Sequence, residues 1–209
     1  PLKFRLSHLA ALLLALNPLH IYYSQELRMY SLSALLAVLS WYFLTKWVNN
    51  KHKKNLIFFT ALSIISFYTF YLSVFILASQ WLYMLFYKRQ YIKPFLVSNL
   101  ALAGSILPWL PTLLTQVKGG GYLTTALPGW SALSGNLSLK SLVLIPAKFS
   151  LGRISILPKN LYYLITGLVL AFVSLVFFLA LRVKRSKLFL FWLFVPLSLA
   201  LLVSTTTPI

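Results

Sequence analysis

The amino-acid sequence contains no cysteine and only one acidic residue, Glu26. Without cysteine the chain forms no disulfide, offers no thiolate nucleophile and builds no cysteine-ligated zinc or iron–sulfur site. With a single carboxylate it cannot bring two acidic groups to one substrate. Any mechanism that needs two carboxylates from this chain is therefore excluded.

Charged residues of both signs together are scarce. They make up 10% of the 209 residues, and 60% of the residues are hydrophobic. In soluble domains about 25% of the residues are charged and roughly 45–50% are apolar. The mean hydropathy is +0.84. The chain therefore lacks the surface of a soluble protein. We expect an all-α, polytopic transmembrane helical bundle, in which each helix satisfies its own backbone polar groups.

Long apolar runs, separated by short basic clusters, organise the chain. A helix of about 20 residues crosses a hydrocarbon core of about 30 Å. We predict about seven spans, at residues 6–21, 30–48, 55–70, 73–87, 94–113, 160–181 and 188–206. Residues 1–209 then form one transmembrane domain of a multi-pass protein. Because the chain opens with Pro1 and ends in an apolar context, we expect it to be an internal piece of a longer protein.

The charges are almost all positive, 19 Lys and Arg against one acid, with a formal net charge of +18. We expect no nucleic-acid partner, because multi-pass proteins keep Lys and Arg in their cytoplasmic loops. The segments that we place in the cytoplasm are the N-terminus and residues 51–54, 88–93 and 182–187. This placement requires a tight hairpin that turns near Tyr68–Ser73. The same parity puts Tyr22–Met29 and the segment 114–159 outside.

The outer segment 114–159 is rich in glycine and proline, which predicts a long loop. Its Gly119–Gly121 run lacks the Lys-Ser/Thr of a nucleotide-binding loop. Within the segment, residues 137–151 are moderately apolar and include Lys140 and Lys148. This pattern favours an interfacial amphipathic helix, and a further buried span is the alternative.

The segment from Asn17 to Ser31 holds the most informative polar residues, Glu26 and Arg28, at a predicted outer membrane boundary. Ionisable groups at such boundaries commonly bind ligands. A cation in the first turn of a helix also needs a nearby anion, because the helix dipole disfavours it there. We therefore expect Arg28 to grip a phosphate. The tyrosines of this segment, taken alone, indicate an interfacial belt.

Other polar residues give weaker signals. His8, His20 and His52 lie far apart without ligand spacing, so we expect no histidine-built metal site. The outer cations, among them Lys118 and Lys148, either contact headgroups or bind a phosphorylated lipid substrate.

The run Asn-Pro-Leu-His-Ile-Tyr-Tyr-Ser-Gln-Glu-Leu-Arg-Met-Tyr-Ser-Leu at 17–32 resembles the second outer loop of the protein-mannosyltransferase-type enzymes. These are membrane glycosyltransferases of the GT-C fold, and they include the bacterial aminoarabinose transferase relatives. Three further features fit the same order along the chain. They are a short outer hairpin with Tyr68 and Tyr71, the Leu-Pro-Trp-Leu-Pro stretch at 107–111, and a span end with Ser and Pro at 204–208.

The resemblance implies an inverting hexosyl- or pentosyltransferase that acts at the outer or lumenal face. Its donor is a polyprenyl-phosphate-linked sugar, and its acceptor is a lipid, a protein or a glycan. A divalent metal, Mg or Mn, often assists, and we expect its ligands mostly outside this chain. The family's catalytic acid belongs to a first outer loop that is absent here, so we expect the chain alone to be inactive.

Residue by residue, the resemblance implies Glu26 and Arg28 as the catalytic groups. The weaker substrate-binding candidates are Tyr22, Gln25, Tyr30, Tyr71 and the outer cation Lys118. The sequence departs from the family at Phe70, where a histidine often stands, so no role of that histidine is carried over.

Two other classes remain open. A transporter or flippase of a lipid-linked or anionic substrate predicts charged or broken helices at the bilayer midplane. A non-catalytic membrane scaffold makes Glu26 and Arg28 boundary residues. In each case we expect an integral multi-pass protein surrounded by membrane lipids, most simply in a bacterial plasma membrane.

Overall fold

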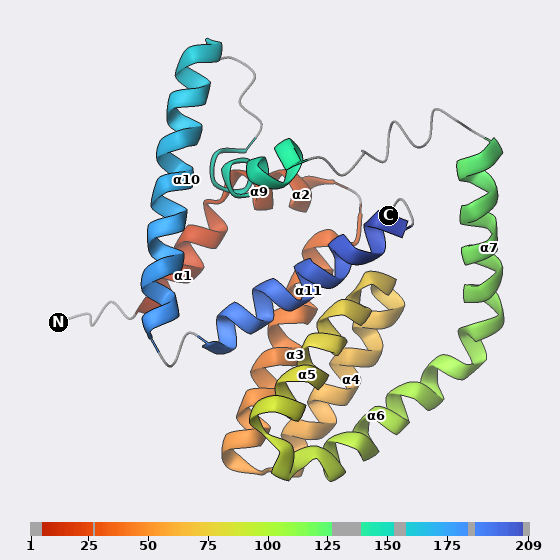
Figure 1. The fold of residues 1–209 in the computed structure, drawn as a ribbon. Helices are drawn as coiled ribbons and strands as arrows, with labels where there is room; N and C mark the ends of the chain where they lie inside the picture. The colour runs from red at the N-terminus through yellow and green to blue at the C-terminus, as the bar shows by residue number, and fades with distance from the viewer. Residues whose placement is uncertain (1–5, 27, 127–138, 153–157, 184–186, 207–209) are drawn as a thin grey trace. The chain divides into compact units, whose positions relative to one another are not determined.

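The structure is a computed structural model that describes residues 6–26, 28–126, 139–152, 158–183 and 187–206. Every regular element in these residues is a helix, so the predicted all-α class is confirmed for them. The α-helices are α1 (Leu6–Ala15), α2 (Pro18–Gln25), α3 (Tyr30–Asn50), α4 (Lys53–Thr69), α5 (Val74–Tyr87), α6 (Ile92–Ile106), α7 (Leu110–Ala126), α9 (Leu139–Leu151), α10 (Lys159–Arg182) and α11 (Lys187–Thr206) (Figure 1). The 3-10 helices are η1 (Tyr71–Ser73), η2 (Arg89–Tyr91) and η3 (Leu107–Trp109).

The contacts divide the chain into two units, where the sequence predicts one domain. Unit 1 comprises the described residues of 1–31 and 137–187, and unit 2 those of 32–136 and 188–209. Each unit has its own packing.

Three helical segments are long and apolar enough to cross a membrane: Tyr30–Asn50, Arg89–Gln116 and Asn160–Arg182. Two shorter apolar stretches, Tyr71–Tyr87 and Leu188–Ser204, accompany them. The described residues therefore have the character of a helical protein with candidate membrane spans. The count of seven spans remains a prediction.

The first predicted span, 6–21, is not one helix. Helix α1 ends at Ala15, and α2 begins at Pro18. Asn17 between them has φ −67° and ψ 121°, and its side-chain oxygen accepts the His20 backbone N–H at 2.9 Å. Proline has no N–H and disfavours a helical residue before it, while asparagine is a preferred N-cap. The break therefore follows from the Asn-Pro pair, which a hydropathy window does not detect.

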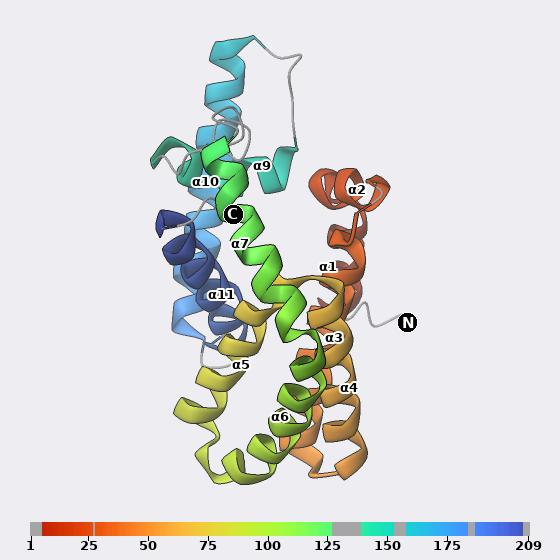
Figure 2. The same ribbon diagram turned by 90° about the vertical axis from the view of Figure 1, so that its right-hand side faces the viewer.

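The predicted hairpin near Tyr68–Ser73 is present in unit 2. Helix α4 ends at Thr69, Phe70 is extended with φ −157° and ψ 114°, and η1 leads into α5. In Figures 1 and 2, α5 runs back to the end of unit 2 at which α4 began.

The predicted loop beginning at residue 114 is corrected. Helix α7 continues through Gly119–Gly121 to Ala126. Each glycine costs a helix only about 1 kcal/mol relative to alanine, so three of them do not force a loop. Helix α9 occupies the stretch in which the sequence predicts a helix, whereas the loop residues 127–138 and 153–157 lie outside the described residues.

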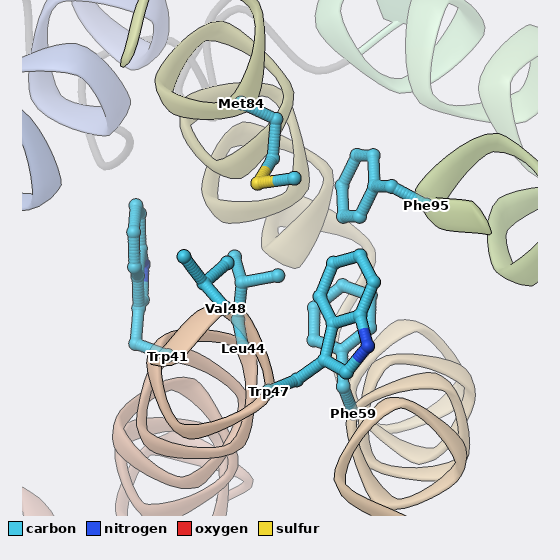
Figure 3. Close-up of a cluster of buried hydrophobic side chains, with 7 residues drawn as sticks. All are labelled: Trp41, Leu44, Trp47, Val48, Phe59, Met84 and Phe95. Carbon is cyan, nitrogen blue, oxygen red and sulfur yellow. The ribbon is translucent and has the colours of Figure 1, made fainter. Parts of the chain in front are cut away.

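The core of unit 2 is an aromatic and aliphatic cluster at which α3, α4, α5 and α6 meet (Figure 3). Its seven members are Trp41, Leu44, Trp47, Val48, Phe59, Met84 and Phe95. The α3 members recur at intervals of three, three and one residues, which places them on one helix face. Beside them, buried Gln80 of α5 donates through Nε2 to Ser40 Oγ of α3 at 2.9 Å. Because an interhelical hydrogen bond satisfies polar groups that lie away from water, it ties these two helices together.

Candidate functional site

The connection between α2 and α3 carries the predicted catalytic pair. Glu26 is the residue after α2 and has φ −71° and ψ 137°. The backbone N–H of Arg28 donates to the Glu26 carbonyl at 2.7 Å. The backbone therefore keeps the two charged residues close together.

The Arg28 side chain lies between an acid and a phenol. Its Nε is 4.0 Å from Glu26 Oε2, and its Nη1 donates to the Tyr30 hydroxyl at 3.2 Å. The side chain of Arg28 is 64% exposed and that of Glu26 is 30% exposed, so the ion pair itself contributes little, about 0–1 kcal/mol. Since a guanidinium has five N–H donors and the Tyr30 bond uses one, Arg28 retains donors for a ligand.

The electrostatic setting keeps Arg28 cationic. The hydrogen bond to Tyr30 raises the pKa of Arg28, and the charges of Tyr30 and then Glu26 raise it further. An arginine is charged throughout the usual assay range, and these contacts favour that charged form.

The helix position of Arg28 differs from the expectation, and Glu26 also lies outside α3. Arg28 precedes α3, which begins at Tyr30, so it does not stand in the first turn. Glu26 lies at the C-terminal end of α2 rather than at the N-terminus of the next helix. A carboxylate is disfavoured at that end, because the helix dipole is negative there. The positive charge of Arg28 therefore offsets the unfavourable interaction of the Glu26 carboxylate with the negative end of the α2 dipole.

An open depression of about 640 Å³ is lined by Glu26, Arg28, Met29 and Tyr30. Its lining combines one cation, one anion and one phenol with the Met29 side chain. The two predicted catalytic groups and the predicted companion Tyr30 thus face the same space.

The remaining predicted residues of α2 have different surroundings. Gln25 is exposed at the last position of α2. Tyr22 lines a separate hollow, which α2 and α9 share. Its ring contacts the Tyr23 ring edge to face at 5.3 Å, and Tyr23 contacts Tyr30 in the same way at 5.1 Å. Tyr23, which no sequence signal distinguishes from its neighbours, therefore connects α2 to the depression.

Helix α9 and the residue after it position α2 through two contacts that the sequence does not predict. Asn17 Nδ2 donates to the Phe149 carbonyl at 2.8 Å. Gly152 follows α9 with φ +72°, and a Cβ added there would lie 2.9 Å from Pro18 Cβ. Both the left-handed backbone and the close approach require glycine. These contacts fix the start of the helix whose end carries Glu26.

The predicted residues Tyr71 and Lys118 belong to unit 2. The Tyr71 hydroxyl accepts the Trp109 indole N–H at 2.8 Å, which joins η1 to η3. Lys118 is exposed on α7.

The described residues contain no group of three or more histidines, cysteines or acids that can hold a metal ion. A divalent metal prefers several oxygen ligands, and this chain has one carboxylate. The described residues therefore do not supply the ligand set of a divalent metal by themselves.

Comparisons with protein-family models, with curated proteins and with solved structures find no match for this chain.

Proposed function

We propose that this protein is a membrane glycosyltransferase that moves a sugar from a polyprenyl-phosphate donor to an acceptor hydroxyl at the outer or lumenal face. One observation carries the proposal. An exposed guanidinium is held beside a carboxylate and a phenol on an open depression, within the run that resembles the protein-mannosyltransferase-type loop.

In the proposed reaction the acceptor oxygen forms a bond to the anomeric carbon as the bond from that carbon to the phosphate oxygen breaks. The electron pair of the broken bond stays with the lipid phosphate, which gains negative charge. The planar fork of Arg28 can bind two phosphate oxygens and compensate that charge. The Tyr30 hydrogen bond orients the fork.

Glu26 has a second role in the proposal. Its carboxylate faces the guanidinium at 4.0 Å, where it holds Arg28 and can accept a hydrogen bond from a sugar or acceptor hydroxyl. The proton of the acceptor leaves to a base that we assign to a group outside residues 17–32, as in the family that this run resembles.

The proposed membrane placement sets the basic connections after α3 and α5 in the cytoplasm and the α2–α3 connection outside. Helix α3 has 21 residues, which corresponds to about 30 Å, enough to cross a hydrocarbon core. In unit 2, both basic connections lie at one end (Figures 1 and 2). The opposite end, near η1 and η3, carries the uncharged Tyr71–Trp109 pair. Such a charge asymmetry is typical of the positive-inside pattern.

The experiment measures sugar release from labelled polyprenyl-phosphate donors, in membranes of cells that produce the protein from its natural gene. We expect Arg28→Ala to slow transfer about 100-fold or more, as with loss of a transition-state donor. Arg28→Lys should recover part of the rate, because an ammonium keeps the charge and loses the fork.

Arg182→Ala is the matched control. Arg182 is exposed at the end of α10, and its guanidinium lies 4.9 Å from the Phe178 ring centroid. The control should transfer sugar at the wild-type rate. If Arg28→Ala did the same at equal protein abundance, Arg28 would be a boundary residue and the proposed function would be wrong.

A further inference from the structure

Unit 2 carries a cluster of cations at one end that the proposed reaction does not use. We call it the basic face, and its members are Lys51, Lys53, Lys54, Lys88, Arg89 and Lys93. They come from the α3–α4 and α5–α6 connections and the first turns of α4 and α6, which lie at the lower end of unit 2 in Figures 1 and 2. Lys88 is half-buried and the others are exposed. The chain's one carboxylate, Glu26, belongs to unit 1, so the basic face contains no acid.

Tyr91 joins the two halves of the basic face. Its backbone N–H donates to the Lys88 carbonyl at 2.9 Å. Its ring packs edge to face on Trp47 at 5.8 Å, and Lys51 Nζ lies 5.9 Å from its centroid. Tyr91 therefore links Lys51 and Trp47, at the end of α3, to the backbone of the α5–α6 connection.

Lys51 stands in a strained backbone conformation. Its φ of 58° is the one positive φ of a non-glycine residue in the described part of the chain. Its N–H donates to the Trp47 carbonyl at 2.7 Å, which closes α3. Glycine or asparagine usually occupies this position, and another residue costs about 1–2 kcal/mol there. Because strained backbone positions cluster at functional sites, we take Lys51 as the starting point for a site that uses its charge.

Lys46 has a different arrangement. Its Nζ donates to the Tyr42 hydroxyl at 3.2 Å and lies 5.2 Å from the centroid of the same ring. Because this pairing turns the ammonium back along α3, Lys46 is not a member of the basic face. It offers a cation of the same helix for comparison.

Exposed apolar side chains lie close to the basic face. On α4 they are Ile57 and Phe58, and on α5 they are Leu85 and Phe86. A soluble anion would leave these side chains in water. A lipid would cover them with its acyl chains while its phosphate meets the cations.

We propose that the basic face binds the phosphate of an anionic glycerophospholipid of the surrounding leaflet, with Lys51 and Arg89 as the central contacts. The lipid sits as a fixed annular ligand at Tyr91 and locks the two connections together. This inference rests on the membrane placement proposed above, and it needs no transferase activity.

The test uses purified residues 1–209 in dodecylmaltoside micelles that contain either phosphatidylglycerol or phosphatidylcholine. Native mass spectrometry then measures the lipid retained by each protein. The wild type should retain phosphatidylglycerol in preference to phosphatidylcholine. Lys51→Gln with Arg89→Gln should weaken retention roughly 30-fold, because each cation near anionic lipid contributes about a factor of five.

Two control pairs show whether a loss of lipid retention comes from this site, from the lower net charge or from misfolding. Lys46→Gln with Lys148→Gln removes two cations elsewhere and should change retention less than threefold. Lys51→Arg with Arg89→Lys keeps both charges and should retain the lipid. Equal loss in the Lys46/Lys148 pair, or loss in the charge-keeping pair with unchanged helical content, would overturn the site.

Extraction of the chain from membranes tests the proposed membrane placement separately from the lipid site. If the chain resists alkaline extraction from membranes and shows no preference for phosphatidylglycerol, the lipid site is wrong and the membrane placement stands. If alkaline carbonate releases the chain, both are wrong.

Discussion

Two cationic regions of this protein differ in how many cations they contain and in how firmly side-chain contacts hold those cations. At Arg28 a single guanidinium is held between a carboxylate and a phenol, and it lines a depression. At the basic face six cations occur without an acid, and one of them, Lys51, lies over the ring of Tyr91. Directed donors serve a transition state of defined shape, whereas a dense field of cations serves a charged surface. We therefore propose chemistry at Arg28 and lipid binding at the basic face.

The largest expected effect is in labelling, because each region should react with a reagent from one side of the membrane only. Because the chain has no native cysteine, single cysteines report their own position. His52→Cys and Gln90→Cys should react with an impermeant maleimide only from the cytoplasmic side. Ser24→Cys, beside the Arg28 segment, should react only from outside. Labelling of positions 52 and 90 from opposite sides would contradict the hairpin topology.

The next effect concerns the support of the Arg28 segment. Gly152→Ala adds a Cβ at 2.9 Å from Pro18 Cβ on a left-handed backbone, which should destabilise unit 1 by about 2–3 kcal/mol. Thermal unfolding followed by circular dichroism should show this loss, and lipid retention by the basic face should be unchanged. Gly167→Ala is the control. It meets open space on α10, so it should be neutral or stabilising by up to about 1 kcal/mol. Equal behaviour of the two variants would show that the α2–α9 contact does not matter.

A smaller effect tests the partner of Arg28. Glu26→Gln removes the anion that competes with phosphate for the guanidinium, and exposed pairs are worth about 0.2–1 kcal/mol. Binding of a polyprenyl monophosphate should therefore tighten by up to about fivefold, while transfer slows. Weaker phosphate binding in this variant would mean that Glu26 positions Arg28 more than it competes. Retention of phosphatidylglycerol should not change.

The smallest effect is at Lys51. Lys51→Gly relieves the φ of 58° and should raise the free energy of unfolding by up to about 1 kcal/mol. It also removes one cation, so retention of phosphatidylglycerol should fall about fivefold. Lys53→Gly removes an equal charge from the first residue of α4. Because Lys53 is not a central contact, this variant should lower retention less than Lys51→Gly, and it should bring no gain in stability. A stability gain in both variants would point to charge repulsion as the cause.

Local sequence signals predicted much of the fold. The all-helical class follows from composition, and the turn after Thr69 follows from charge parity. The helix at 139–151 lies within the apolar stretch between the glycine and proline clusters. The break at Asn17 and the continuation of α7 past Gly119 were missed. Hydropathy measures apolarity, and it detects neither a capping side chain nor a helix that tolerates glycine.

For the candidate site, the sequence indicated residues that lie close together but not their geometry, and their catalytic and binding roles stay predictions. The sequence singled out Glu26, Arg28 and Tyr30, and the structure places all three on one depression. It did not single out Tyr23 or Gly152, because their roles depend on ring contacts and on a backbone approach between segments far apart in sequence. Tertiary contacts of this kind leave no periodic pattern.

The most direct measurement compares the binding of a short-chain polyprenyl monophosphate and its parent alcohol to residues 1–209 in phosphatidylcholine nanodiscs. Wild-type protein should prefer the phosphate, and Arg28→Ala should lose this preference. The Lys51→Gln/Arg89→Gln pair should keep it within about twofold. If Arg28→Ala bound the phosphate as the wild type does, or if only the Lys51/Arg89 pair lost it, the phosphate site would not be at Arg28.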